Sequence, residues 1–219
     1  MKTNIKLLIG ISCAIAATLL ASCHPFEDPG SLREEQRSYS VADFDQLEMG
    51  DAFIINVEQG EAHNVVVKGD ARNLDDLLVY VESGTLKVRF DDYRNRRHQT
   101  YITIAMPQVK GLNFSGASTA TVSGLVSDNR LDVVVSGASK LTLNGYGEFL
   151  NSSISGASRL YAFDYLAQEV YTDVSGASKA RVYAEVRLDA IASGASYIGY
   201  KGEPVVYKNT SGASIVRKE

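Results

Sequence analysis

The tetrapeptide Ser-Gly-Ala-Ser recurs six times in the C-terminal half of the chain. The copies begin at Ser115, Ser136, Ser155, Ser175, Ser193 and Ser211, with successive spacings of 21, 19, 20, 18 and 18 residues. Such a period, without a helical hydrophobic pattern, is typical of a β-solenoid, in which each turn of chain packs on the previous one. We therefore predict an all-β fold, a β-helix or β-solenoid with six Ser-Gly-Ala-Ser corners, over residues 111–219.

The residues that follow each copy alternate in polarity, as a half-buried strand requires. The second residue after the motif is always apolar, and the residues are Ala120, Leu141, Leu160, Ala180, Ile198 and Val216. The residue directly after the motif is Thr119, Lys140, Arg159, Lys179, Tyr197 or Ile215, and it is polar in the first four copies. Because successive side chains of a strand point to opposite faces, we expect the first column to face inward and the second outward.

The corner residues have a structural explanation. The recurring glycines are Gly116, Gly137, Gly156, Gly176, Gly194 and Gly212. Stacked coils bend sharply at one edge, and glycine adopts a positive-φ or crowded conformation without a Cβ clash. We expect the serines to hydrogen-bond local backbone groups at the bend, and the stacked copies to form a ladder of hydroxyls at the strand spacing of about 4.8 Å. A catalytic role is not expected, because a nucleophile is a single residue beside a base, and the repeat region contains no histidine.

The segment 39–110 is rich in strand-forming residues but carries no repeat. Predicted strands cover 52–57, 64–68, 77–81, 85–90 and 101–106, whereas 73–78 suggests a helical turn. A free solenoid end exposes unpaired backbone groups. We therefore expect this N-terminal β segment to cap or extend the first coil rather than to form a remote domain.

Residues 1–22 have the features of an export signal. Lys2 and Lys6 precede an apolar stretch, 7–20, that is too short to span a bilayer. The sequence Leu-Ala-Ser-Cys that ends at Cys23 resembles the lipobox of bacterial lipoproteins, in which the cysteine is acylated and becomes the mature N-terminus. The resemblance implies a lipid on Cys23 and attachment to a membrane without a transmembrane helix.

Residues 23–38 are predicted to be a tether, because they are rich in proline, glycine and charge and lack apolar periodicity. The acidic pair Glu27-Asp28 behind the lipid resembles the export tag of surface lipoproteins in some diderm bacteria. We therefore expect a lipid-anchored protein of the cell envelope, in the outer membrane and displayed outward.

Composition excludes several classes of function. The net charge of −4 over 219 residues gives no reason to expect nucleic acid as a partner. The chain has two cysteines and three histidines, too few for a zinc or iron–sulfur framework, and no disulfide scaffold can form. We predict no metal and no cofactor.

Several short motifs resemble those of a known family. They are Phe44-Asp-Gln-Leu47, Asn73-Leu74 followed by Glu82-Ser-Gly-Thr-Leu86, Met106-Pro107 and the six corners. From about Tyr39 to the C-terminus they resemble the putative auto-transporter adhesin head domain, also called the GIN domain, of bacterial surface proteins and lipoproteins. The resemblance implies a β-helix-like fold and a role at the cell surface, and it brings no catalytic residues.

One outward column is a candidate binding site. Lys140, Arg159 and Lys179 follow three consecutive copies and should stack as a cationic ladder. Like charges on neighbouring strands repel unless an anion or nearby carboxylates neutralise them, so the column is suited to an acidic glycan or surface polymer. Alternatively, salt screens the repulsion and the charges serve solubility alone. Tyrosines crowded into the later coils offer a second surface, either for sugars or for packing.

We therefore predict a non-catalytic adhesin or surface-interaction module. The alternatives are a polysaccharide-active, pectinase-like β-helix enzyme and a structural envelope protein that self-assembles as a homo-oligomer. Asp132 and Asp189 stand at equivalent positions but three turns apart, about 14 Å at the strand spacing. An inverting carboxylate pair needs roughly 6.5 to 9.5 Å, so no acid–base pair is expected.

The basic run 94–98 is interpreted as a solvated loop, with phosphate contact as the alternative.

Overall fold

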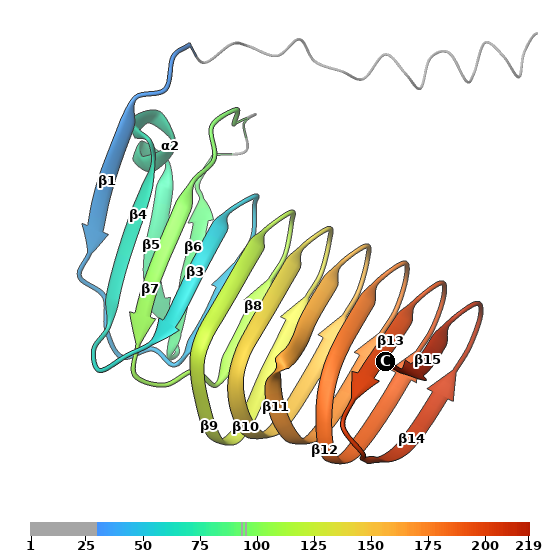
Figure 1. The fold of residues 1–219 in the computed structure, drawn as a ribbon. Helices are drawn as coiled ribbons and strands as arrows, with labels where there is room; N and C mark the ends of the chain where they lie inside the picture. The colour runs from blue at the N-terminus through green and yellow to red at the C-terminus, as the bar shows by residue number, and fades with distance from the viewer. Residues whose placement is uncertain (1–29, 93, 95) are drawn as a thin grey trace, which may run out of the picture. The chain divides into compact units, whose positions relative to one another are not determined.

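Coils of β-strand stacked along one axis make up most of the molecule (Figure 1). This computed structural model describes residues 30–219 apart from 93 and 95, and Ser31–Glu219 form one compact unit. The strands are β1 Glu34–Tyr39, β2 Gln46–Met49, β3 Ile54–Gln59, β4 Asn64–Asp70, β5 Leu77–Glu82, β6 Thr85–Phe90, β7 Tyr101–Met106, β8 Gly111–Phe114, β9 Thr119–Val135, β10 Lys140–Ile154, β11 Arg159–Val174, β12 Lys179–Ala192, β13 Tyr197–Lys201, β14 Val205–Thr210 and β15 Ile215–Lys218. One short helix, α2, covers Ala71–Asp75. The predicted signal peptide, Cys23 and the start of the tether lie outside the described residues.

The predicted all-β solenoid is confirmed. Each of the strands β9 to β12 runs from one corner to the next and bends on the way, so that its two ends lie in opposite walls of the solenoid. We call the wall of β3, β13, β15 and the starts of β9 to β12 the post-corner wall. The wall of β2, β8, β14 and the ends of β9 to β12 is the pre-corner wall. Neighbouring coils pair in parallel throughout both walls.

The alternation of side chains follows the predicted pattern. The inward column is buried at Ala120, Leu141, Leu160, Ala180 and Ile198, and Val216 packs against the core with partial burial. The outward column pairs in register from Thr119 to Lys140, then to Arg159, Lys179, Tyr197 and Ile215. The apolar interior is one cluster that continues through the N-terminal coils.

Each Ser-Gly-Ala-Ser corner is a point of close backbone approach. The six glycines have φ between +69° and +76°. The amide of Ala138 donates to the carbonyl of Gly116 at 2.8 Å, and the same bond repeats from corner to corner. A Cβ on Gly137 would lie 2.4 Å from that Gly116 oxygen, so two independent constraints require glycine.

The predicted ladder of hydroxyls is wrong. In three motifs the second serine bonds to the backbone of the neighbouring coil: the Oγ atoms of Ser118, Ser196 and Ser214 donate to the carbonyls of Gly50, Val174 and Ala192 at 2.9 to 3.0 Å. The Oγ atoms of Ser139 and Ser158 are buried and make no hydrogen bond to another described residue. Ser178 Oγ instead accepts from the Ser158 amide at 3.3 Å. The carbonyl of the coil beneath is a strong acceptor that lies within reach, so the side chain satisfies backbone rather than another hydroxyl.

Residues 39–110 extend the solenoid, as expected, but in an order that the sequence does not suggest. The coil of β2 and β3 lies between the coil of β6 and β7 and the first Ser-Gly-Ala-Ser coil, although it precedes both in the chain. Beyond it, β4 pairs antiparallel with β7, β1 with β4, and β5 with β6. These antiparallel strands cover the N-terminal end of both walls (Figure 1).

Strand β1 differs from the sequence-based expectation, because it lies in the C-terminal part of the segment predicted as a tether. It pairs with β4 from Glu34 opposite Asp70 to Tyr39 opposite Val65. Its side chains alternate between exposed and half-buried, so this edge strand needs no apolar face. Ion pairs of Glu34 with Lys68, at 3.1 Å, and of Arg37 with Asp75, at 2.7 Å, accommodate its charges.

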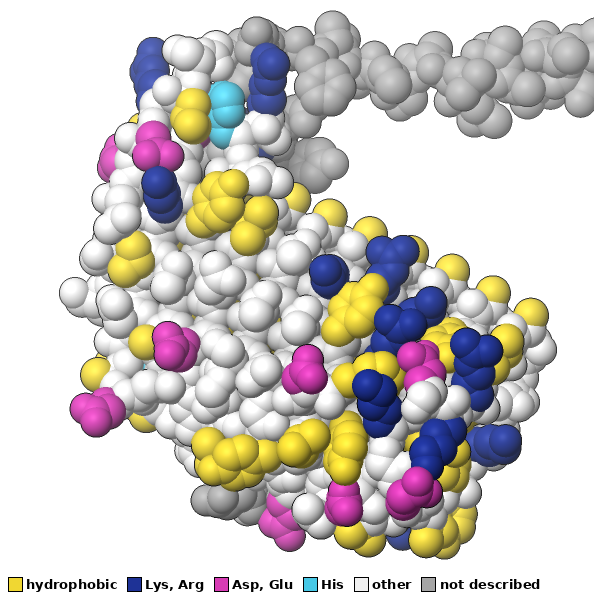
Figure 2. Space-filling view, in the orientation of Figure 1, with side chains coloured by type: hydrophobic (Ala, Val, Ile, Leu, Met, Phe, Trp, Pro, Cys, Tyr) yellow, Lys and Arg dark blue, Asp and Glu magenta, His cyan; other side chains and the backbone are white. Residues whose placement is uncertain are grey.

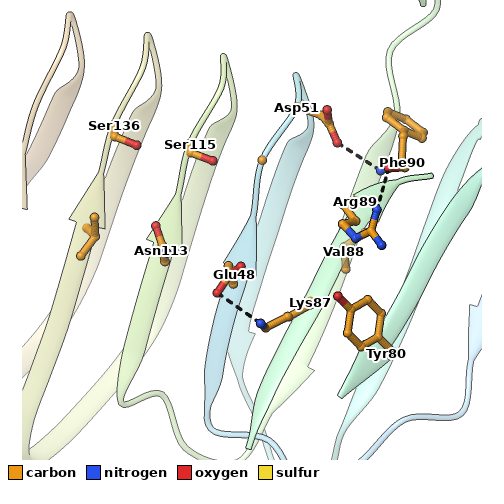
Figure 3. Close-up of a pocket in the computed structure, with 12 residues that line it drawn as sticks. Glu48, Asp51, Tyr80, Lys87, Val88, Arg89, Phe90, Asn113, Ser115 and Ser136 are labelled. Carbon is orange, nitrogen blue, oxygen red and sulfur yellow. Dashed lines mark hydrogen bonds and ion pairs between the residues drawn. The ribbon is translucent and has the colours of Figure 1, made fainter. Parts of the chain in front are cut away.

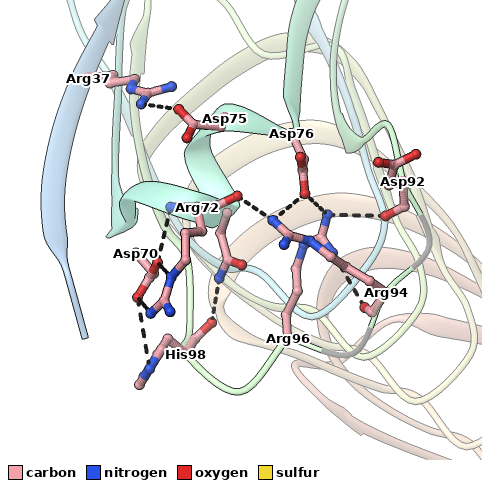
Figure 4. Close-up of polar contacts among 10 residues, drawn as sticks. Arg37, Asp70, Arg72, Asp75, Asp76, Asp92, Arg94, Arg96 and His98 are labelled. Atoms are coloured by element: carbon pink, nitrogen blue, oxygen red, sulfur yellow. Dashed lines mark hydrogen bonds and ion pairs between the residues drawn. The ribbon is translucent and has the colours of Figure 1, made fainter. Parts of the chain in front are cut away.

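A buried carboxylate fixes the start of α2 (Figure 4). Asp70 is 1% exposed and is the N-cap of this helix. It accepts hydrogen bonds from the amides of Arg33 and Arg72, at 3.1 and 3.0 Å, and from the Arg72 guanidinium at 2.6 and 2.7 Å. These bonds, the Arg72 side chain foremost, hold the pKa of Asp70 well below its usual range.

We expect Gly137→Ala to lower the free energy of unfolding by about 2–4 kcal/mol, because the new Cβ meets a positive φ and the carbonyl of the coil beneath. Gly60→Ala is the matched control, since its nearest atom would lie 3.8 Å away and its φ is ordinary. Urea denaturation of both variants measures the difference. Equal losses would show that the corners do not require glycine.

We expect Asp70→Asn to cost about 1–3 kcal/mol at neutral pH, since asparagine retains the cap but loses the charge-assisted bonds. The folded pKa lies below the unfolded value of about 3.9, so the contribution is present above that value and is lost as pH falls through the folded pKa. Thermal denaturation from pH 7 to pH 2 should therefore show the gap between parent and variant closing in acid. A gap that is constant with pH would contradict this origin.

Candidate functional site

The three predicted cations lie side by side on the outside of the post-corner wall. Lys140 is directly opposite Arg159, and Arg159 is opposite Lys179, on consecutive strands. In the part of the chain that the structure describes, none of the three makes an ion pair with a carboxylate. The mutual repulsion that the sequence suggests is therefore not relieved by neighbouring acids.

Aromatic rings accompany these cations instead. The Lys140 ammonium lies 5.3 Å from the centre of the Tyr161 ring, and that of Lys179 lies 5.0 Å from the Tyr197 ring. Each ring belongs to the coil next to its cation, so rings and cations alternate over the wall. Contacts of this kind contribute about 0.5–1 kcal/mol at exposed sites.

Further cations and rings enlarge the patch, and sequence reasoning missed them. The Phe163 ring lies between Arg181, at 5.9 Å, and Lys201, at 4.5 Å, and Arg217 lies 5.2 Å from the Tyr197 ring. We call the set the cation–aromatic face, and its members are Lys140, Arg159, Lys179, Arg181, Lys201, Arg217, Tyr161, Phe163 and Tyr197. Figure 2 shows dark blue and yellow side chains interleaved over the later coils of this wall. Arg181 could have been found, because it stands two residues after Lys179 and so points the same way.

One carboxylate, that of Glu219, contacts the cation–aromatic face. Glu219 accepts a hydrogen bond from the Tyr197 hydroxyl at 2.6 Å and from Arg181 Nε at 3.3 Å. The hydrogen bond from Tyr197 is the main cause that lowers the pKa of Glu219. Burial is the main cause that raises the pKa of Tyr197, and its hydrogen bond to Glu219 raises that pKa further. Arg181 is therefore partly neutralised, whereas Lys140, Arg159 and Lys179 have no carboxylate partner among the described residues.

The tyrosines of the later coils do not share one surface. Tyr165 is fully buried, and burial raises its pKa to about 12. Tyr171 and Tyr207 lie on the opposite, pre-corner wall, in the column that also holds Asp189. Only Tyr161 and Tyr197 contribute rings to the cation–aromatic face.

A second candidate site is a hollow on the pre-corner wall, where β6, β2, β8 and the end of β9 run side by side (Figure 3). Its volume is about 640 Å³. The residues around it are Glu48, Gly50, Asp51, Tyr80, Lys87, Val88, Arg89, Phe90, Asn113, Ser115, Val134 and Ser136. We call it the pre-corner groove.

Charges of both signs line the pre-corner groove. Lys87 lies 2.8 Å from Glu82 and 3.8 Å from Glu48, and the hydrogen bond with Glu82 is the main cause that raises the pKa of Lys87. A hydrogen bond with Tyr80 is the first cause that raises the pKa of Arg89. The groove is thus polar and nearly balanced in charge, unlike the cation–aromatic face.

The carboxylates do not converge. Asp132, Asn151, Tyr171 and Asp189 follow one another in a single column, so three coil steps separate the two acids. Asn151 donates to Asp132 at 2.6 Å, which engages that carboxylate structurally. Within residues 30–219 without 93 and 95, no group of His, Cys, Asp and Glu is arranged to hold a metal ion.

The basic run 94–98 is not a freely solvated loop. Arg94 and Arg96 both pair with Asp76 at the end of α2, the latter at 3.0 Å (Figure 4). Arg96 also lies 3.8 Å from the centre of the Phe90 ring, and its side chain is 9% exposed. These contacts attach the loop to α2 at the N-terminal end of the solenoid.

The fold is a β-solenoid that presents two extended walls of stacked parallel strands. The family model described as "putative auto-transporter adhesin, head GIN domain" matches residues 43–204, and the chain belongs to this family. The family suggests a protein of the cell surface or envelope. A comparison with curated proteins finds no match.

Two solved structures share the fold. A putative adhesin from Bacteroides fragilis has a TM-score of 0.71 at 20% identity, over 86% of this chain and 98% of that one. A putative adhesin from Parabacteroides distasonis has a TM-score of 0.55 at 18% identity, over 87% of this chain and 98% of that one. Among the residues described, no helix has the length and apolar character needed to cross a membrane.

Proposed function

We propose that this chain is a lipid-anchored, non-catalytic adhesin whose cation–aromatic face binds acidic polysaccharide. The observation that carries the proposal is the register of Lys140, Arg159 and Lys179, three adjacent cations without a carboxylate partner among the described residues. Like charges held at strand spacing repel one another, and an anionic ligand would relieve that repulsion.

The rings of the same face support a sugar as the carrier of those anions. Tyr161, Phe163 and Tyr197 offer partly exposed, amphipathic or apolar surface between the cations. An aromatic ring packs against the apolar side of a pyranose, while a neighbouring cation binds its carboxylate or sulfate. A wall of stacked strands repeats this arrangement along its axis, which suits a polymer.

A non-catalytic role is supported by the absence of convergent chemistry on the described surface. The acids of the Asp132 column are separated by Asn151 and Tyr171, and the buried Asp70 is committed to the cap of α2. The corner serines Ser118, Ser196 and Ser214 donate to the backbone of neighbouring coils.

Replacing Lys140, Arg159 and Lys179 together by serine should weaken binding of a uronic-acid polymer at least about tenfold, since each exposed charge contact contributes up to about 1 kcal/mol. The control replaces Lys110, Arg130 and Arg187 by serine, which changes net charge equally but lies off this face. Binding is measured by biolayer interferometry in low and moderate salt, and salt should weaken the parent more than the variant. Equal losses in both variants would overturn the assignment to this face.

Cys23→Ser should release the protein from the membrane fraction, since a serine hydroxyl does not carry the acyl group. Cell fractionation and metabolic labelling with an alkyne fatty acid measure the effect, and Cys13→Ser is the control because Cys13 lies within the predicted signal. Retention of the unlabelled variant in the membrane would contradict the lipid anchor.

A further inference from the structure

The pre-corner groove lies where the repeat is broken. The corner between β2 and β3 reads Gly50-Asp51-Ala52-Phe53 instead of Ser-Gly-Ala-Ser. Its backbone is nevertheless equivalent to the later corners, because Met49 pairs with Phe114 and the Ala117 amide donates to the Asp51 carbonyl at 2.7 Å. Gly50 therefore stands where six copies have serine, and Asp51 where six copies have glycine.

Both departures act on the same groove. A Cβ on Gly50 would lie 3.1 Å from Ser115 Oγ, so a serine here, as in the other corners, would occupy the space beside Ser115. Asp51 adopts φ of +60°, which costs more for aspartate than for glycine. Its carboxylate accepts from the Phe90 amide at 3.1 Å, at the rim of the groove (Figure 3). The substitutions open space and add a carboxylate where the regular corner has neither.

Several polar groups in the groove have unused hydrogen-bonding capacity. The side chains of Asn113, Ser115 and Ser136 make no hydrogen bond to another residue of the described chain. Asn113 and Ser115 lie on one coil and Ser136 on the next, so together they present an amide and two hydroxyls (Figure 3). Such groups both donate and accept, which matches the hydroxyls of a sugar.

The balance of charge selects the class of ligand. Glu48 and Asp51 oppose Lys87 and Arg89 around the groove, so the lining offers no net charge to an anionic polymer. The carboxylates accept from sugar hydroxyls, the cations donate to ring and hydroxyl oxygens, and Tyr80 supplies a ring at one side. The volume of about 640 Å³ falls within the roughly 300–1,000 Å³ typical of small-ligand sites.

We propose that the pre-corner groove is a second binding site, specific for a neutral saccharide. It lies on the wall opposite the cation–aromatic face, and it shares no residue with that face. The proposal does not rest on the function proposed above, since the groove has its own shape, charge and partners.

The test uses the full-length chain and three neutral probes: maltotriose, mannotriose and chitotriose. Gly50→Ser restores the residue of the other corners at a position with ordinary φ, so it should narrow the groove beside Ser115 without unfolding the chain. Asn113→Ala removes one polar contact. Ser153→Ala is the matched control, because Ser153 occupies the same column as Asn113 two coils away. Thermal denaturation verifies that each variant is folded.

Isothermal titration calorimetry should show binding of at least one probe, weakened at least about tenfold by Gly50→Ser and about threefold or more by Asn113→Ala, with Ser153→Ala unchanged. No binding of any probe to the parent at about 10 mM would overturn the proposal, since that limit corresponds to less than about 3 kcal/mol. Binding that survives both groove variants, or that is lost only in the triple variant of the cation–aromatic face, would also overturn it.

Discussion

The approach of backbone to backbone at the corners is the constraint on which the rest of the structure depends. At each Ser-Gly-Ala-Ser corner a carbonyl of one coil accepts from the alanine amide of the next, at 2.8 Å in all five successive pairs of copies. Only glycine fits, because its Cβ position is occupied by the oxygen of the coil beneath. This contact fixes the register of both walls, and register decides which side chains enter the core and which stack outside.

The opposite side of each coil has no such constraint, and it absorbs the variation in length. Register shifts occur between Leu143 and Gly145 and between Ala162 and Leu166, at the bend farthest along the strand from the corners. Copies spaced by 18 to 21 residues can therefore stack without disturbing the corners. Recognition surfaces near the corners are regular as a result, whereas those near the bend, such as the surroundings of Phe163, are not.

The sequence carries the fold and the stacked cations because both depend on local patterns. Glycine at fixed places and a two-residue alternation determine the corner and the direction of Lys140, Arg159 and Lys179. The repeat begins only at Ser115, so it contains no information about how the unrepeated strands before it pair. The position of the β2–β3 coil and the edge strand β1 could therefore not be predicted. The partnership of Lys201 with Phe163 depends on the irregular bend, and the groove depends on Gly50 and Asp51, which do not match the motif that reveals the repeat.

A solenoid separates stability from recognition more completely than a globular core does. The inward columns and the corner backbone hold the coils together, so outward residues can change without loss of register. Lys140, Arg159 and Lys179 then present three charges over about 10 Å at strand spacing. A single small anion cannot neutralise all of them, whereas one anionic polymer would contact all three. Because its charges are linked, the polymer would bind with higher affinity than any one exposed charge contact provides. The groove follows the opposite rule: a bounded ligand needs a local hollow, and this hollow lies beside the corner at which Gly50 and Asp51 depart from the repeat.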